Sequence, residues 1–351
     1  MNHNEFNPEI GTEKEYDEWV GELARYGMGQ VLDIVPNHMS IVEDGNSWWI
    51  DVLENGPSSA YADYFHIDWK PVKEELENKV LLPVLGDQYG RVLEDQELRL
   101  VFEEGAFFIL YYDRRFPLAP TTYKKILELR LEDLKKKMGS DHPQLLELLS
   151  ILTALEHLPL RTERNVEKIL ERRREKEIIK RRLGDLYNKS TEVRAFVDEN
   201  IRLFNGEKGS PPSFDLLNDL LNDQVYRLSH WRVATEEINY RRFFDINELA
   251  AIRMENPKVF REAHQLIFKL IREGKVTGLR VDHPDGLYNP SDYFYQLQRG
   301  CFIQFCLREA GSSSDEPALE EKISGFYDEV ISKNPGSPLR MPLYIVGEKI
   351  L

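Results

Sequence analysis

An arginine and an aspartate stand two residues apart in the apolar stretch GLRVDHPDGL, residues 278–287. Side chains alternate along a β-strand, so Arg280 and Asp282 share one face while Leu279 and Val281 share the other. A neighbouring arginine keeps a carboxylate ionised, which a nucleophile or a group that stabilises a cation requires. The pair could equally be a salt bridge that only positions a loop, and this stretch alone leaves both alternatives open.

Two further apolar segments end in polar side chains, QVLDIVPNHMS at 30–40 and PLYIVGEKIL at 342–351. The polar residues at these strand ends are Asp33, Asn37 and His38 in the first segment and Glu348 in the second. Parallel strands deliver catalytic groups at their carboxyl ends, so we expect these side chains to form one site with Asp282. An ionised aspartate and a glutamate that can hold a proton are suited to glycosidic bond chemistry. His38 is either a donor to a sugar hydroxyl or a satisfied core histidine.

Helices, glycine turns and buried strands follow one another at both ends of the chain. Thr12 and Glu15 form a capping box at the start of a first helix, which ends at Gly27 before the strand at 30–40. Helices are predicted near 257–273, 291–309 and 319–333, between the remaining strands. This alternation is typical of an α/β protein with a parallel sheet.

The middle of the chain breaks that alternation. Residues 92–113 predict a small antiparallel hairpin that turns at Glu104 and Gly105, and helical patterns follow near 121–138, 142–157, 163–183 and 189–204. We therefore expect three segments: a first barrel segment at 1–40, an inserted and mostly helical subdomain at 41–230, and a second barrel segment at 231–351.

The composition excludes several classes of partner. A net charge of -15 repels phosphates and argues against nucleic acid. The two cysteines suggest neither a disulfide framework nor a metal site, and no apolar run is long enough to cross a membrane. No targeting segment is evident, so we expect a cytoplasmic protein without cofactor or metal.

The three polar segments resemble conserved regions of the α-amylase clan of glycoside hydrolases. DIVPNH, GLRVDHPDGL and GEKIL look like the first, second and third regions of that clan, in the right order. Within the clan, these segments together with NPEIG (7–11) and INYRRFFDINELA (238–250) are similar to the maltooligosyltrehalose synthases. The resemblance implies a partial (β/α)8 TIM barrel, about strands 3 to 5, with a large insertion after strand 3.

The resemblance also implies a role for each polar side chain. Asp282 is the implied nucleophile, Glu348 the general acid and base, and Arg280 the partner that orients and ionises Asp282. Asp33 and Asn37 would brace the strand end, and His38 would contact the sugar. The full set of substrate-binding residues that we expect is His38, Asn37, Asp33, His283, Tyr89, Arg241 and Phe243.

The implied activity is that of a (1->4)-α-D-glucan 1-α-D-glucosylmutase in trehalose biosynthesis, a retaining transglucosylase that acts on maltooligosaccharides. Glu348 protonates the last α-1,4 oxygen, Asp282 captures the anomeric carbon, and the freed glucose turns and attacks through its own anomeric hydroxyl. Retention needs two displacements, hence carboxyl groups about 5 Å apart. The inserted subdomain would act as a lid that excludes water.

Other functions compete with this hypothesis. An α-glucan hydrolase of the same clan would use the same acids but admit water. A non-catalytic glucan-binding remnant is the alternative from another class, since the clan's third acid and several strands have no counterpart here. The chain therefore resembles an internal fragment, and we expect an open partial barrel to associate with itself. A metal enzyme is least favoured, because no ligand spacing supports it.

Aromatic residues crowd the segment after the first motif, and each is either a sugar platform or part of the core. They are Trp48, Trp49, Tyr61, Tyr64, Phe65, Trp69 and Tyr89.

Overall fold

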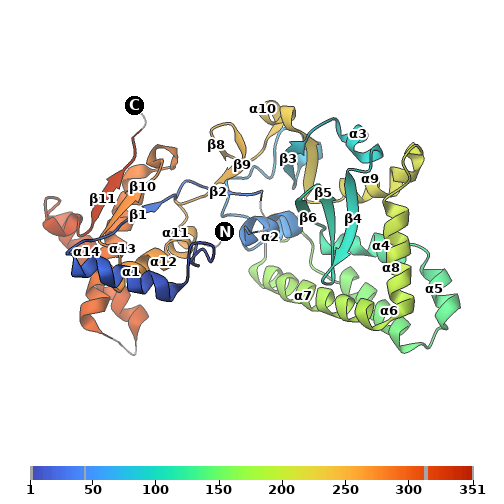
Figure 1. The fold of residues 1–351 in the computed structure, drawn as a ribbon, viewed down its shortest axis with the longest axis horizontal. Coiled ribbons are helices and arrows are strands. Elements are labelled where there is room, and N and C mark those ends of the chain that lie inside the picture. Colours follow the sequence, from blue (N-terminus) through green and yellow to red (C-terminus); the bar gives the residue numbers. More distant parts are fainter. Residues whose placement is uncertain (1–2, 43–44, 312–314, 350–351) are drawn as a thin grey trace. The chain divides into compact units, whose positions relative to one another are not determined.

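In the computed structural model, three short strands pair in a parallel sheet in the order β1-β10-β11 (Figure 1). The strands are β1 (Val31–Ile34), β10 (Gly278–Val281) and β11 (Tyr344–Gly347). Their register sets Asp33 opposite Arg280 and Ile34 opposite Val281, so the strands end at the same level. Leu279 and Val281 are fully buried while Arg280 lies on the other face, as the alternation predicts.

The structure describes residues 3–42, 45–311 and 315–349, and the chain divides into two compact units. The first unit contains residues 1–39 and 251–351, and the second contains residues 40–250. Residues 231–250 thus fall in the second unit, whereas the sequence analysis groups them with the last segment. The mixture of helices and sheet agrees with the predicted α/β class. Within the described residues the parallel sheet has three strands, so the eight-stranded barrel remains a prediction.

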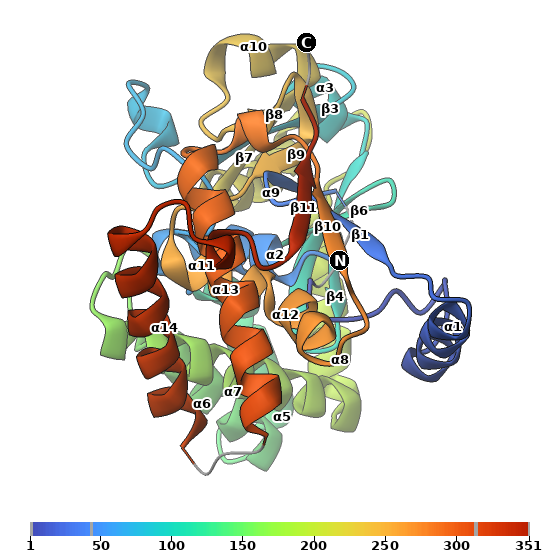
Figure 2. The same ribbon diagram turned by 90° about the vertical axis from the view of Figure 1, so that its left-hand side faces the viewer.

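The helices of the first unit surround the parallel sheet, with α13 and α14 side by side (Figures 1 and 2). They are α1 (Glu13–Arg25), α11 (Pro257–Ala263), α12 (Gln265–Arg272), α13 (Pro290–Ala310) and α14 (Glu316–Lys333). The predicted capping box is present: the Thr12 hydroxyl accepts from the Glu15 N–H, and the Glu15 carboxylate accepts from the Thr12 N–H.

Two elements of the first unit differ in extent from their predictions. The strand within residues 30–40, which was expected to close at Pro36, ends at Ile34, and a separate strand β2 (His38–Ser40) begins after Pro36, which has no N–H for a ladder. The helix expected at 257–273 divides at His264 into α11 and α12.

The second unit contains more strand than the predicted hairpin. β4 (Leu98–Glu103) and β5 (Ala106–Tyr111) form that hairpin, and β6 (Arg114–Pro117) extends it. The unit also contains a parallel pair, β3 (Val80–Leu85) with β7 (Tyr226–His230). In a third small sheet, β9 (Ile246–Ala251) lies between β2 and β8 (Arg242–Phe243).

The helices of the second unit are α2 (Ser47–Asn55), α3 (Tyr89–Glu94), α4 (Tyr123–Glu128), α5 (Leu131–Met138), α6 (Pro143–Glu156), α7 (Val166–Lys189), α8 (Thr191–Phe204), α9 (Asp215–Asn222) and α10 (Ala234–Glu237). The four helical stretches predicted in this unit are present as α4 to α8, and α2, α3, α9 and α10 were not predicted. The predicted 121–138 helix breaks into α4 and α5 because Arg130 adopts a left-handed conformation with φ of +59°.

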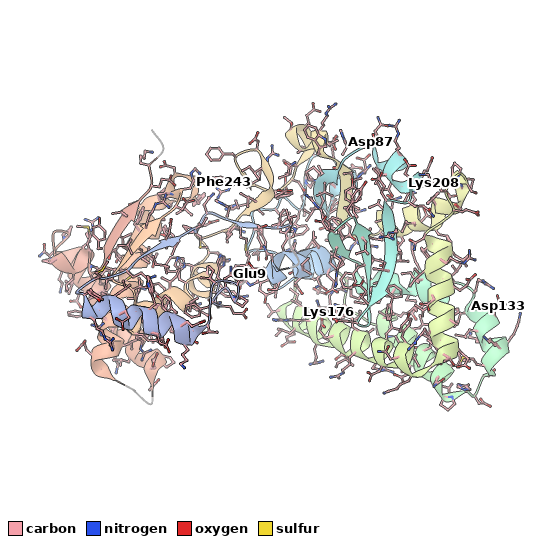
Figure 3. The ribbon with its side chains drawn as sticks, viewed as in Figure 1. Glu9, Asp87, Asp133, Lys176, Lys208 and Phe243 are labelled. Atoms are coloured by element: carbon pink, nitrogen blue, oxygen red, sulfur yellow. The ribbon has the colours of Figure 1, made fainter. Side chains whose placement is uncertain are left out.

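A buried ionic cluster joins α7 to α2, and Figure 3 marks Lys176 on α7. The Lys176 ammonium lies 2.9 Å from an oxygen of Asp51 and pairs with Glu54, which also pairs with Lys180. Lys176 and Glu54 are each only 4% exposed. Burial alone would raise the pKa of Glu54, but Lys176 and Lys180 outweigh it and lower that pKa, so the carboxylate stays charged.

The tip of the β4–β5 hairpin packs against α7 through two glycines. Gly105 has φ of +86°, and a Cβ there would lie 2.1 Å from the Lys180 carbonyl oxygen. A Cβ on Gly184 would lie 3.1 Å from the Gly105 Cα. Backbone meets backbone at this contact, so no side chain can move away to make room.

Gly105→Ala is therefore expected to lower the free energy of unfolding of the second unit by more than about 3 kcal/mol, from steric overlap added to backbone strain. Gly209→Ala is the matched control, because Gly209 has a similar φ of +88° but open space around it. Its cost should be about 1–2 kcal/mol. Urea unfolding of both variants measures the difference, and equal losses would contradict the predicted contact.

A buried histidine and tyrosine pair connects α11, α12 and α13. His264 is 2% exposed; its Nδ1 lies 2.7 Å from the Phe260 carbonyl and its Nε2 lies 2.8 Å from the Tyr293 hydroxyl. Nδ1–H therefore donates to the carbonyl and Nε2 accepts from the hydroxyl, which fixes the neutral tautomer. Burial lowers the pKa of His264 to about 4.

The lowered pKa of His264 predicts a loss of stability in mild acid. Between pH 6.5 and about 4 the unfolded state binds a proton that the folded state does not, so stability falls as pH falls through this window. The contribution of this one group is at most on the order of 3 kcal/mol. Unfolding temperatures from pH 8 to 5 should decrease less in His264→Gln, whereas the same change at exposed His157 should leave the wild-type slope. An unchanged slope in His264→Gln would refute the assignment.

Candidate active site

One guanidinium group contacts three carboxylates at the carboxyl ends of the parallel strands. Arg280 Nη1 lies 2.6 Å from Asp33 Oδ2 and 3.3 Å from Asp282 Oδ1, and its Nη2 lies 3.3 Å from Glu348 Oε2. All three strands thus contribute an acid to the same cation. The hydrogen bond that Arg280 donates to Asp33 is the largest of the interactions that raise the pKa of Arg280, so the guanidinium stays charged.

Backbone hydrogen bonds position the two predicted catalytic acids. The Asp282 N–H donates to the Ile34 carbonyl at 2.8 Å, and the Glu348 N–H donates to the Val281 carbonyl at 2.9 Å. Each acid is therefore the first residue beyond its strand and is still held by the neighbouring strand. Their side chains are 26% and 37% exposed, respectively, so both are accessible to a ligand.

The turn after β10 is held close to this acidic cluster. His283 adopts a left-handed conformation with φ of +44°, and its N–H lies 3.4 Å from Glu348 Oε2. A Cβ on Gly286 would lie 2.6 Å from both Asn37 Oδ1 and His283 Cδ2. Asn37 is 3% exposed, so it packs under the turn and supports the bracing role more than direct contact with a ligand.

His38 lies beside Asn37 at the start of β2, half-buried. Asn37 Nδ2 lies 3.4 Å from His38 Nδ1. Burial lowers the pKa of His38, and this outweighs the opposing effect of Asp282, so the ring is neutral at pH 7. A neutral imidazole offers one donor and one acceptor, which suits contact with a hydroxyl group.

Sequence reasoning missed an ion pair between the two loops that carry the acids. Lys349 Nζ lies 2.9 and 2.8 Å from the two oxygens of Asp285. The pair connects the residue after Glu348 to the turn after Asp282. The signal was available in the sequence, because HPDG and GEK each place a charge just past a strand end.

The predicted site residues divide between the two units. Asp33, Asn37, His38, Arg280, Asp282, His283 and Glu348 all lie in the first unit around the ends of β1, β10 and β11. Tyr89, Arg241 and Phe243 lie in the second unit, where the Tyr89 hydroxyl donates to Asn218 Oδ1 at 3.1 Å and burial raises its pKa to about 12. Their place in a common site remains a prediction.

Most of the aromatic residues after the first motif belong to the core of the second unit. Trp48, Trp49, Tyr64, Phe65 and Trp69 are each at most 9% exposed. Trp49 meets Phe65 edge to face with ring centroids 4.9 Å apart. Of the two alternatives for this cluster, burial therefore favours core packing for these five residues.

In the described part of the chain, no group of three His, Cys, Asp or Glu side chains is arranged to hold a metal ion. Within the same residues, no helix has both the length and the apolar character needed to cross a membrane. The cation that contacts all three carboxylates of the acidic cluster is Arg280.

Comparisons with known proteins point to one kind of enzyme. No family model matches the chain. A curated protein of Mycobacterium tuberculosis, named as a candidate maltooligosyl trehalose synthase, is 27% identical over 294 residues, which are 83% of this chain and 25% of that protein. The solved maltooligosyltrehalose synthase of Arthrobacter ramosus is 29% identical and superposes with a TM-score of 0.53.

The chain resembles maltooligosyltrehalose synthases. The Arthrobacter match covers 86% of this chain and 27% of the enzyme. A solved glycosyltrehalose synthase matches at 26% identity and a TM-score of 0.52, and the match covers 86% of this chain and 29% of the synthase. The chain thus spans about a quarter of the length of the maltooligosyltrehalose synthases that it matches. A shorter match, 32% over 75 residues, is to the intracellular maltogenic amylase of Bacillus subtilis; it covers 21% of this chain and 12% of the amylase. The resemblance predicted from the motifs is confirmed.

Removal of Arg280 tests the electrostatic arrangement of the cluster. In Arg280→Met three carboxylates remain together without their shared cation, so the unfolding temperature should fall at low salt, and the deficit should shrink at about 1 M salt, which screens the repulsion. Arg25→Met, which removes the partner of a single glutamate on α1, should change little at either salt concentration. A deficit in Arg280→Met that is independent of salt would contradict the arrangement.

Proposed function

We propose that the chain contributes the catalytic acids of a retaining α-glucan glucosylmutase that converts maltooligosaccharides to maltooligosyltrehalose. The observation that carries the proposal is the convergence of Asp282 and Glu348 on one guanidinium at the ends of adjacent parallel strands. The resemblance to maltooligosyltrehalose synthases supports the choice of substrate.

In the proposed first step, Glu348 protonates the oxygen of the last α-1,4 bond while Asp282 attacks the anomeric carbon. The bond to the terminal reducing-end glucose breaks, and a covalent glycosyl ester forms on Asp282. Arg280 contacts and orients Asp282 before attack, and Asp33 in turn holds Arg280 in place.

In the proposed second step, the released glucose turns within the site before it can leave. Glu348, now a carboxylate, takes the proton of the glucose anomeric hydroxyl, whose oxygen attacks the anomeric carbon of the glycosyl ester and releases the Asp282 carboxylate. The new linkage is α,α-1,1, so the product has lost its reducing end. His38, neutral at pH 7, and His283 are the first-unit side chains that we place against the reacting sugar.

The substrate-binding set extends into the second unit in our proposal. Arg241 and Phe243 are assigned to the leaving-group side of the substrate, because they lie in INYRRFFDINELA, which resembles the maltooligosyltrehalose synthases. Tyr89 is assigned to the substrate-binding set as an aromatic contact. Phe243 meets Phe244 edge to face with centroids 4.5 Å apart, and Phe244 is 62% exposed, which supports an aromatic contact surface there.

Hydrolysis is the second candidate activity. The 75-residue match to a maltogenic amylase favours it, since water in place of the second glucose would use the same two acids. Hydrolysis adds a reducing end, whereas the mutase removes one, so product analysis separates the two.

We also propose that the sheet is part of a (β/α)8 barrel and that the chain associates with itself. The supporting observation is exposure at both edges of the three-stranded sheet: Val31 on β1 is 51% exposed and Tyr344 on β11 is 64% exposed. Unpaired edges of a parallel sheet invite further strands.

The activity is tested by incubating the chain with maltohexaose and measuring reducing ends and free glucose. A fall in reducing ends with little glucose is the expected result, and Asp282→Asn and Glu348→Gln should each lower the rate at least about a thousandfold. Asp292→Asn, an acid at the start of α13 outside the cluster, is the matched control and should retain activity. A rise in reducing ends would identify hydrolysis instead, and an unchanged count would refute catalysis by this chain alone.

A further inference from the structure

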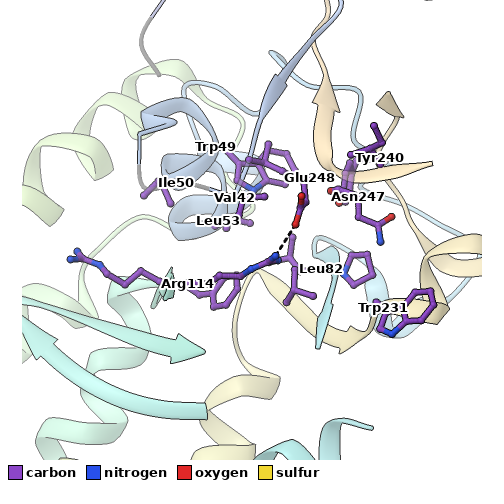
Figure 4. Close-up of a pocket in the computed structure, with 16 residues that line it drawn as sticks. Val42, Trp49, Ile50, Leu53, Leu82, Arg114, Trp231, Tyr240, Asn247 and Glu248 are labelled. Carbon is purple, nitrogen blue, oxygen red and sulfur yellow. Dashed lines mark hydrogen bonds and ion pairs between the residues drawn. The ribbon is translucent and has the colours of Figure 1, made fainter. Parts of the chain in front are cut away.

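A cavity of about 240 Å³ lies within the second unit and takes no part in the acidic cluster (Figure 4). Its walls come from residues 41–42, from α2, from β3, from β6, and from Trp231, Tyr240 and the start of β9. Every lining residue belongs to residues 40–250, so the cavity is complete within one compact unit.

Aromatic and aliphatic side chains form the inner wall of the cavity. Trp49 and Leu53 of α2 are at most 2% exposed, and Trp49 meets Tyr240 edge to face at 5.3 Å. Burial raises the pKa of Tyr240, whose hydroxyl donates to the Asn247 carbonyl oxygen at 2.8 Å. Trp231 stands at the rim and is 52% exposed, so much of its indole surface is accessible to a ligand.

A charged pair and an amide interrupt this apolar surface. Arg114 Nη2 lies 2.8 Å from Glu248 Oε1, and Figure 4 shows the two side chains directed toward each other within the cavity. The second Glu248 oxygen remains as an acceptor, and the other guanidinium N–H groups remain as donors. Asn247 Oδ1 accepts from Arg242, which leaves the amide nitrogen as a further donor.

We propose that this cavity is a sugar-binding site that holds one pyranose ring of an α-glucan. Sugar rings combine an apolar C–H face with a rim of hydroxyl groups, and the cavity offers an exposed indole together with a carboxylate, a guanidinium and an amide. An apolar ligand would remove water from that ion pair without offering hydrogen bonds in its place. The choice of glucose as the sugar rests on the proposed function, whereas the recognition of a pyranose rests on the cavity alone.

The size of the cavity favours a single ring. Sites for drug-sized ligands enclose about 300–1,000 Å³, so 240 Å³ suits one ring and not a buried oligosaccharide. The rim position of exposed Trp231 allows the rest of a glucan to extend into solvent from the bound ring. The cavity would then hold a glucosyl unit that is not the one undergoing reaction.

The test measures binding of methyl α-D-glucopyranoside by calorimetry to the Asp282→Asn chain, so that no catalysis is needed. Trp231→Ala and Glu248→Gln should each weaken binding about tenfold through loss of the stacking surface or of charge-assisted hydrogen bonds. Trp19→Ala is the matched control, since Trp19 is similarly exposed at 48% but belongs to the first unit, and it should bind as the parent does. Unfolding temperatures of all variants establish that each is folded. If Trp231→Ala does not fold, Glu248→Gln still tests the site, because glutamine has nearly the shape of glutamate.

Cyclohexanol, a ring with one hydroxyl, is the ligand control. The site is established if the glucoside binds, if both cavity variants bind it more weakly, and if cyclohexanol binds less tightly than the glucoside. This result would stand even if maltohexaose is not converted. The proposal is overturned if the glucoside does not bind, if both cavity variants bind it as tightly as the parent, or if cyclohexanol binds equally well. Failure of the proposed catalysis would appear separately, as an unchanged reducing-end count in the maltohexaose experiment.

Discussion

The acidic cluster depends on one cation in a fixed place. Arg280 can reach three carboxylates only because β1, β10 and β11 run parallel and in a register that ends them together. Without that guanidinium, Asp33, Asp282 and Glu348 would repel one another at short range. The sheet therefore does more than support the acids, since it sets the distance at which one charge can serve all three.

The loops that follow the three strands further restrict the positions of Asp282 and Glu348. Asn37 packs beneath Gly286, the His283 N–H faces Glu348, and Lys349 holds Asp285. The residues that make these contacts lie within a few positions of the acids in sequence, but they follow different strands. Because the sheet is rigid, short loops anchored on it can hold the acids in a defined geometry.

Much of this site was predictable from the sequence, and particular residues show why the rest was not. Strand alternation placed Arg280 beside Asp282, but the shorter contact is to Asp33, which only the inter-strand register brings opposite Arg280. The capping box at Thr12 and the turn at Gly105 are local signals and were predicted correctly. β3 was missed because Pro83 interrupts its pattern and its partner β7 lies more than a hundred residues away. The roles of Tyr89, Arg241 and Phe243 depend on tertiary arrangement that no local pattern specifies.

The buried charges between α2 and α7 have a consequence for how this protein can diverge. Glu54 is shared by Lys176 and Lys180, so replacement of that one acid would leave two largely buried ammonium groups with only Asp51 and Glu177 as acidic partners. Substitutions at these positions should therefore appear together in descendants of this sequence, either as a complete exchange for apolar residues or not at all. The ion pairs on the outward face of α7, such as Lys168 with Glu171, are exposed and contribute little to stability, so residues there can change one at a time. Within α7, the rate of amino-acid substitution should therefore differ between the buried and the outward face.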